Sequence, residues 1–126
     1  MIKYTVEVHA NGTKIWHLNG KFHREDGPAV EGDDGTKKWY LNGELHREEK
    51  PAIEYAIGDK SWYLNGKLHR EDGPAVEYID GRKRWYLNGK SITEQEHKKA
   101  TTKATCDGKE VEIDGVTYIL KEKQNG

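Results

Sequence analysis

The sequence lacks features on which several functional classes depend. It has one cysteine among its 126 residues, Cys106, so it cannot form an internal disulfide or supply a thiolate cage for zinc. It also has no apolar run of about 18 residues and no secretory signal. These absences predict a protein without a membrane span in a reducing compartment, for which the cytoplasm is the simplest choice.

The chain has no excess of either charge, with 21 basic and 22 acidic residues and a formal charge of −1. This balance argues against a general nucleic-acid or membrane-surface binder, which would show a basic excess. No P-loop, dinucleotide fingerprint, nucleophile elbow or HExxH motif occurs, and the six histidines lack a compact metal-ligand spacing. The sequence therefore predicts a non-enzymatic protein without a cofactor or a metal site.

The aromatic residues define an internal repeat. Four tryptophans, 23 residues apart, each begin a similar phrase: WHLNGKFHREDGPAVE, WYLNGELHREEKPAIE, WYLNGKLHREDGPAVE and the shorter WYLNGKSITE. Four tryptophans and seven tyrosines also argue against disorder in a chain with 34% charged residues. A fixed period of this length indicates an array in which each unit buries its apolar face against its neighbours.

Turn chemistry predicts antiparallel hairpins in every copy. Asn-Gly at 65–66 and its equivalents favours a two-residue type I′ turn, which pairs Leu64 with Lys67 and Tyr63 with Leu68. Asp80-Gly81 and its equivalents are assigned the same turn type.

The assigned register of this second turn places Glu77 opposite Arg84 and Val76 opposite Trp85. The same register places Val30 opposite Trp39 and Ile53 opposite Trp62. Two irregularities follow from it. Ile57-Gly58 replaces the Asp-Gly pair, so that turn is expected to bulge or change type, and Glu7 faces Trp16.

This register also predicts two unlike faces of the sheet. Each tryptophan, the leucine two residues later and the facing Val or Ile form the expected core stripe. The repeat core comprises Trp16, Trp39, Trp62, Trp85, His23, His46 and His69. On the other face we expect Tyr40, Tyr63 and Tyr86 with the remaining leucines and the Glu–Lys or Glu–Arg pairs.

The repeat pattern stops after Lys90. Thr93 and Glu96 form a capping box before helix-forming residues, which predicts a short helix at about 94–103. A hairpin around Asp114-Gly115 is expected at about 109–121. The fold prediction is mainly β: an elongated antiparallel β-hairpin array over 1–90, followed by a C-terminal cap over 91–126 with one short helix and a terminal hairpin.

The phrase W-Y-L-N-G-K-x-H-R-E-D-G-P-A resembles the MORN-like repeat arrays of tailed phages and giant viruses, and a related pattern occurs in YwqK-type antitoxins. The resemblance covers about residues 4–90. It implies rows of β-hairpins that serve as a scaffold or binding surface. MORN repeats usually have glycine after the histidine, where this chain has Arg24, Arg47 and Arg70. This departure argues against the membrane and phosphoinositide roles of eukaryotic MORN proteins.

The His-Arg pairs are the first candidate site. A row of arginines at Arg24, Arg47 and Arg70 could bind phosphates or carboxylates, because a guanidinium suits bidentate contacts. Alternatively, each histidine packs on its cross-strand tryptophan and each arginine pairs with the acidic residue that follows. The structural reading is favoured, since residues shared by all copies usually build the repeat. The acid pairs, such as Glu71-Asp72, are likewise assigned to turns.

The tyrosine row is the second candidate site. Tyr40, Tyr63 and Tyr86 could contact a partner together with arginines, because tyrosine and arginine are enriched in binding hot spots. They could also stack on nucleobases. The alternative is that this face packs against the C-terminal helix or forms a second core.

These observations predict a phage-encoded, non-enzymatic binding protein that inhibits a host defence or toxin protein in the bacterial cytoplasm. The expected surface comprises Tyr40, Tyr63 and Tyr86 with Arg47 and Arg70. One alternative is a sponge for a small anionic nucleotide signal, held by Arg24, Arg47 and Arg70. A third is a structural component of an assembly, and the open sheet edge allows a homodimer.

Overall fold

The computed structural model describes residues 4–101, 109–113 and 116–120. The first half of the array contains β1 (Tyr4–Val8), β2 (Lys14–Leu18), β3 (Lys21–Phe22), β4 (Val30–Glu31), β5 (Lys37–Lys38), β6 (Tyr40–Leu41) and β7 (Glu44–Leu45). The second half contains β8 (Ile53–Glu54), β9 (Lys60–Ser61), β10 (Tyr63–Leu64), β11 (Lys67–Leu68), β12 (Val76–Glu77), β13 (Lys83–Leu87) and β14 (Lys90–Ile92). The cap contains α1 (Glu94–Thr101), β15 (Lys109–Ile113) and β16 (Val116–Leu120).

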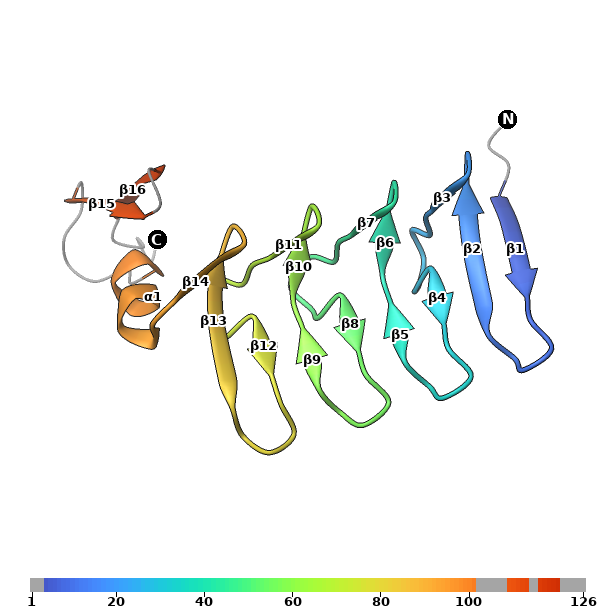
Figure 1. Cartoon of the computed structure of the whole chain (residues 1–126). Coiled ribbons are helices and arrows are strands. Elements are labelled where there is room, and N and C mark those ends of the chain that lie inside the picture. Colours follow the sequence, from blue (N-terminus) through green and yellow to red (C-terminus); the bar gives the residue numbers. More distant parts are fainter. Residues whose placement is uncertain (1–3, 102–108, 114–115, 121–126) are drawn as a thin grey trace, which may run out of the picture.

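The described strands form one elongated antiparallel sheet and three separate two-stranded sheets, β6-β7, β10-β11 and β15-β16, with α1 at the C-terminal end of the row (Figure 1). The main sheet has the order β1-β2-β4-β5-β8-β9-β12-β13-β14, so strands follow one another in space as they do in the sequence. This arrangement confirms the predicted mainly β hairpin array with one short C-terminal helix. Because each repeat contacts its neighbours in this row, side chains at equivalent positions recur along each face.

The Asn-Gly turns have the predicted type I′ geometry. Asn65 has φ 51° and Gly66 has φ 80°, and the other three copies are alike. Tyr63 faces Leu68 and Leu64 faces Lys67, as predicted. Asparagine tolerates the left-handed conformation better than most residues, and glycine adopts it without steric cost. The dipeptide alone therefore determines this turn.

The Asp-Gly turns were assigned incorrectly. The N–H of Tyr78 donates to Arg82 O and the N–H of Gly81 donates to Tyr78 O, which encloses a three-residue loop. Gly81 has φ 95°, whereas Asp80 is not left-handed. This is the hairpin in which a type I turn is followed by a left-handed glycine.

The longer loop shifts the register by one residue. Val76 faces Arg84, not Trp85, and Glu77 faces Lys83, not Arg84. The predicted Val30–Trp39 and Ile53–Trp62 pairs are wrong for the same reason, since Val30 faces Lys38 and Ile53 faces Ser61. Because side chains alternate between the two faces of a sheet, this shift places the valine and the tryptophan on opposite faces.

The corrected register removes both irregularities of the predicted one. Only the glycine of this loop requires positive φ, so Ile57-Gly58 forms the same loop, closed by the N–H of Gly58 and Tyr55 O. Glu7 faces Ile15, and Val6 faces Trp16. The third copy therefore does not differ from the others as expected, because all copies depart from type I′ in the same way, and the expected Glu7–Trp16 pair is wrong.

Alanine, not valine, completes the core beside each tryptophan. The N–H groups of Trp16, Trp39 and Trp62 donate to the carbonyls of three alanines in the returning segments. These are Ala29, Ala52 and Ala75, each with 0% exposure. Val76 instead lines the opposite face with Tyr63 and Tyr86. The predicted Trp-Leu-Val stripe is thus wrong in its third member, because the register moves valine to the tyrosine side.

The histidine that recurs in the first three repeats joins its own repeat to the next one. The Nδ1 atom of His23 accepts the N–H of Asn42 at 2.8 Å. His46 and His69 accept the N–H groups of Asn65 and Asn88 in the same way. The predicted core role of these histidines therefore includes a contact to the following Asn-Gly turn, which the sequence reading did not anticipate.

The C-terminal helix closes one end of the array. Thr93 and Glu96 form the predicted capping box through reciprocal hydrogen bonds of 2.9 and 3.1 Å. The His97 ring packs on Trp85 at 4.8 Å, and its Nε2 atom lies 2.6 Å from Arg70 O.

The predicted terminal hairpin is confirmed, with Val111 facing Tyr118 and Ile113 facing Val116. Its turn at 114–115 and residue 121 lie outside the described residues. The same holds for the predicted last two residues of the helix, 102 and 103, and for Cys106.

The stacked turns give one testable difference between two glycines. A Cβ on Gly58 would lie 2.7 Å from Ile79 Cγ2, whereas a Cβ on Gly81 has nothing within 4 Å. Both have positive φ, so alanine strains the backbone at both. We expect Gly58→Ala to lower the free energy of unfolding by about 0.5–1 kcal/mol more than Gly81→Ala, because Ile79 must leave its rotamer. Urea denaturation measures the difference, and equal losses would show that the turns do not contact each other in this way.

Candidate binding surfaces on the two faces of the sheet

The face that carries the tryptophans, called the tryptophan face, contains the predicted arginine row. The guanidinium carbon of Arg70 lies 3.8 Å from the ring centroid of Trp62, over the ring. Arg24 stacks on Trp16 and Arg47 on Trp39 at nearly the same distance. Cation–π contacts of this kind, together with burial of the arginine stem, stabilise the repeat.

Carboxylates and a carbonyl occupy the remaining donors of these arginines. Arg70 donates to Glu77 at 2.9 Å, to Asp72 at 2.8 Å and to Pro74 O at 3.1 Å. Arg24 has the equivalent three partners. Arg47 donates to Glu54 and Pro51 O, and its following loop has the different sequence Glu48-Glu49-Lys50. The arginine row is therefore already paired with acidic groups.

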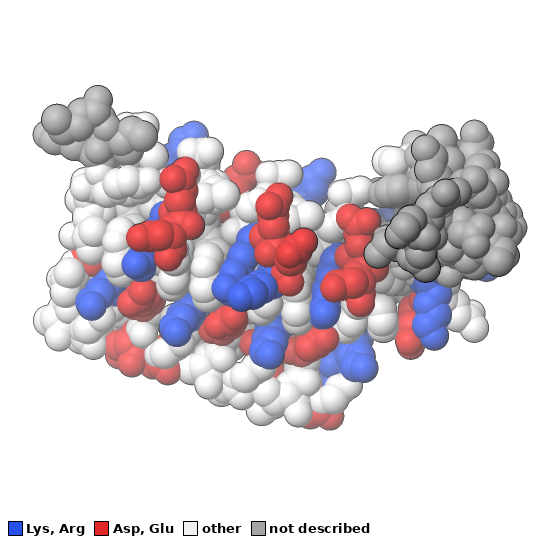
Figure 2. Space-filling model, turned by 180° about the vertical axis from the view of Figure 1, so that it is seen from behind, with Lys and Arg blue, Asp and Glu red and all other residues white. Residues whose placement is uncertain are grey.

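Acidic loops project from the same face above the arginines (Figure 2). Their exposed residues are Glu25, Asp26, Glu48, Glu49, Glu71 and Asp72. Below them, lysines and glutamates alternate across the strands. The register of this ladder is Lys14, Glu31, Lys37, Glu54, Lys60, Glu77, Lys83. Opposite charges on adjacent strands stabilise an antiparallel sheet by about 0.2–1 kcal/mol per pair.

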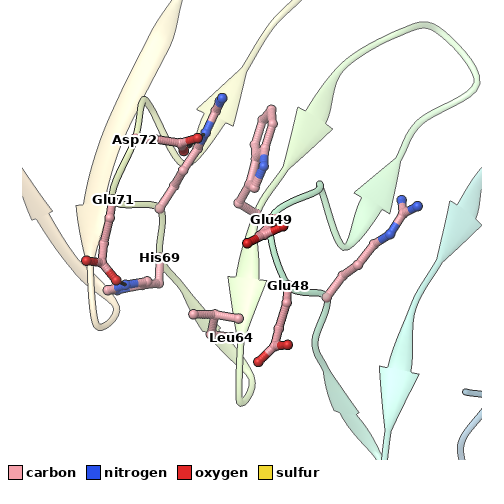
Figure 3. A pocket seen from close by; sticks show the side chains of 9 residues that line it. Glu48, Glu49, Leu64, His69, Glu71 and Asp72 are labelled. Atoms are coloured by element: carbon pink, nitrogen blue, oxygen red, sulfur yellow. Dashed lines mark hydrogen bonds and ion pairs between the residues drawn. The ribbon is translucent and has the colours of Figure 1, made fainter. Parts of the chain in front are cut away.

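A cleft of about 450 Å³ lies between the second and third acidic loops. Trp62, Leu64 and His69 contribute to its wall, with Arg47 and Arg70. In Figure 3, Glu48 and Glu71 lie on either side of Leu64, while Glu49 and Asp72 lie farther along the cleft. Four carboxylates around the cleft disfavour an anionic ligand. Among the residues that the structure describes, no group of three or more His, Cys, Asp or Glu side chains could hold a metal ion.

The opposite face, called the tyrosine face, carries five tyrosines: Tyr40, Tyr55, Tyr63, Tyr78 and Tyr86. Four of them, with Leu68, Val76, Ser61, Asp59 and Arg84, line a shallow depression of about 310 Å³. Tyr55 is 39% exposed and the other four tyrosines are half-buried. The structure thus adds Tyr55 and Tyr78 to the three tyrosines that the sequence predicted.

Burial and two arginines define the electrostatic character of the tyrosine face. Burial, with a smaller contribution from neighbouring tyrosines, raises the pKa of Tyr40 and of Tyr63. The hydrogen bond between the Arg84 side chain and Tyr86 raises the pKa of the Arg84 guanidinium. Arg82 lies over the Tyr78 ring at 4.6 Å. The C-terminal part of this face therefore combines phenol hydroxyls with two cations.

Two exposed isoleucines lie on the turns, each close in sequence to a tyrosine of this face. Ile57 is 67% exposed and Ile79 is 64% exposed. The second copy has Asp34 at the position of Ile57 and Asp33 at the position of Ile79. Since aspartate forms the same turn, the repeat does not require these isoleucines. An isolated exposed isoleucine is common, but two on adjacent turns next to tyrosines indicate a contact surface.

The structure separates the residues of the predicted composite site. Side chains alternate between the faces of an extended strand, so Tyr63 lies opposite to its neighbour Trp62. Because Arg70 stacks on Trp62, it lies on the face opposite to Tyr63. Arg24 and Arg47 lie on the tryptophan face in the same way. The predicted tyrosines gather on one face, and the predicted arginines do not join them.

The sequence reading missed Tyr55, Ile57, Tyr78, Ile79, Arg82 and Arg84 as candidate contact residues. The available signal was the difference between copies, because these positions vary while the rest of the phrase repeats. Residues common to all copies mainly build the fold, as the Arg70–Trp62 contact shows.

No family model matches the chain, and no curated protein or solved structure is significantly similar to it. The resemblance to MORN-like arrays therefore stays a prediction. In the described part of the chain, no helix has the length and apolar character needed to cross a membrane.

Proposed function

We propose that this chain is a non-enzymatic binding protein that holds a protein partner on its tyrosine face. One observation carries the proposal: five tyrosines gather on one face, and the turns next to Tyr55 and Tyr78 in the sequence expose Ile57 and Ile79, which the repeat does not require. Tyrosine combines a large apolar ring with a hydroxyl and loses little conformational entropy on binding. Arg82, which pairs with Asp80 at 2.8 Å, and Arg84, which bonds to Tyr86, add positive charge beside the tyrosines.

The partner that we propose is a bacterial host protein, such as a defence or toxin component, which the chain inhibits by covering its surface. The support for this class is the resemblance to phage arrays together with the absence of catalytic motifs in the sequence. The tyrosine face of the described array is a long surface with a depression of about 310 Å³, which suits a protein surface better than a small substrate. In this proposal the chain is phage-encoded and acts in the cytoplasm of the bacterial host.

The nucleotide-sponge alternative receives less support from the contacts. To bind phosphates, an arginine such as Arg70 would have to give up its stacking on Trp62 and its ion pairs with Asp72 and Glu77. Breaking these ion pairs and bringing phosphate near the acidic loops both cost free energy. A protein partner on the tyrosine face requires neither change.

The experiment compares native mass spectra of the tagged wild-type chain and a variant with Ile57→Asp and Ile79→Asp, both recovered gently from bacterial lysate. These substitutions copy Asp34 and Asp33, so we expect an unchanged melting temperature. The wild type should retain a stoichiometric host protein, and the variant should lose it. Retention of the protein by the variant would contradict the proposed face. A small added mass in place of a protein would support the sponge.

A further inference from the structure

The two ends of the array differ in how they are covered. At the C-terminal end, His97 of α1 packs on Trp85. At the N-terminal end, β1 pairs with β2 on one side, and no described strand pairs with its other side. All five residues of β1 are exposed. An uncovered edge strand offers its backbone groups to another chain.

The free edge of β1 is apolar on one face. Tyr4, Val6 and Val8 alternate along the strand, so they share the tryptophan face, and they are 44%, 44% and 66% exposed. Val6 occupies the position of the fully buried Ala29, Ala52 and Ala75 in later copies. Edge strands that avoid association usually carry lysine or proline. Residues 4–8 contain neither, and their one charged residue is Glu7.

The backbone pattern of β1 fits pairing with a second copy. His9 and Thr13 are joined by a hydrogen bond at the turn, so hydrogen-bonded pairs alternate from there along β1 and β2. Tyr4, Val6 and Val8 therefore direct their N–H and C=O groups to the free edge. Antiparallel pairing centred on Val6 would join Val6 to Val6 and Tyr4 to Val8 of the second copy.

The side chains in this register are also compatible. Tyr4 and Val8 make an aromatic–aliphatic pair on both sides of the central valines, and each Glu7 faces Thr5 and not another Glu7. The contact is isologous, which gives a closed two-fold dimer. The depression lined by Tyr4, Val6 and Trp16 lies beside this edge.

We infer that two copies of this chain associate through antiparallel β1–β1 pairing about Val6. The two sheets become one continuous sheet, and the dyad perpendicular to it places both tyrosine faces on the same side. The dimer offers two partner sites, so a partner with repeated epitopes would bind with increased avidity.

Sedimentation velocity over about a hundredfold range of concentration tests this inference with four variants of the full chain. We expect the wild type to shift from monomer to dimer, and Val6→Lys to weaken the dimer at least about tenfold because two lysines would face each other. Thr5→Glu should also weaken it, since it places carboxylates opposite Glu7. Thr5→Lys should strengthen it about threefold or more through two new ion pairs.

The fourth variant, Arg84→Glu, alters the opposite end of the array and should leave the dimer unchanged. Circular dichroism spectra should show that every variant retains its fold, because the altered side chains of β1 are exposed. A wild type that remains monomeric throughout would overturn the inference. So would association that tolerates Val6→Lys, or that is lost with Arg84→Glu, which would indicate head-to-tail contacts. Sedimentation is measured on the purified chain alone, so its result does not depend on whether a host protein binds the tyrosine face.

Discussion

Replacing Trp62 with alanine is expected to lower the free energy of unfolding by about 3–5 kcal/mol, the range for removing a large buried aromatic side chain. Trp62 is 8% exposed, and its ring supports the Arg70 guanidinium at 3.8 Å. Its loss leaves a cavity in the middle of the array and removes the surface on which Arg70 stacks. Because every repeat depends on its neighbours, a central defect affects both halves of the sheet.

Trp16→Ala is the matched control for this prediction. Trp16 makes the same arginine contact but lies in the first copy and is half-buried. We expect its replacement to cost clearly less, because only one end of the array loses packing. Urea denaturation followed by far-ultraviolet circular dichroism measures both variants without depending on tryptophan fluorescence. Equal losses would mean that the central repeat is not more important to stability than the terminal one.

Replacing Tyr63 and Tyr86 together with histidine is expected to weaken partner binding about a hundredfold or more. This estimate assumes that at least one of them is a hot spot, with an effect of about 2 kcal/mol or more, and that the other adds to it. The first copy has His17 at the equivalent position, so the array accommodates histidine there. The stability should therefore change little, while the phenol hydroxyls and part of the aromatic surface are lost.

A double substitution on the tryptophan face is the control for the tyrosine variant, because it changes two side chains on the other face of the sheet. Glu48→Gln with Glu71→Gln changes two exposed carboxylates beside the cleft while retaining their size. Isothermal titration calorimetry with the host protein recovered by the tagged chain should give nearly wild-type affinity for this variant. A large loss there, with little loss in the tyrosine variant, would transfer the binding surface to the acidic loops.

The sequence predicted the turns and strands where the residues allow one conformation. Asn65-Gly66 requires positive φ at both positions, so its type I′ turn and the Tyr63–Leu68 pair could be inferred directly. Asp80-Gly81 is compatible with two hairpin loops, because aspartate adopts either right-handed or left-handed backbone angles. The neighbouring pairs could not decide between them, since both registers oppose Glu77 to a cation.

The site was only partly predictable, because strand patterns determine which face a side chain occupies but not how the loops fold over it. Alternation along each strand, together with the 23-residue period, placed Tyr63 and Tyr86 on a common face, and this holds in the structure. The location of Arg70 depends on how the loop after β11 folds back over Trp62, and strand periodicity does not describe a loop. Ile57 and Ile79 become adjacent only because consecutive turns stack, as the Gly58–Ile79 approach shows.

The proposed partner site is the tyrosine face and not the tryptophan face. The most direct test measures the affinity of the recovered host protein for two variants that keep the wild-type fold. Each variant changes the charge of one face. These are Ile57→Asp with Ile79→Asp on the tyrosine side and Glu48→Gln with Glu71→Gln on the tryptophan side. We expect the first pair of substitutions to abolish measurable binding and the second pair to preserve it. Preserved binding in the isoleucine variant together with lost binding in the glutamate variant would show that the partner binds the tryptophan face.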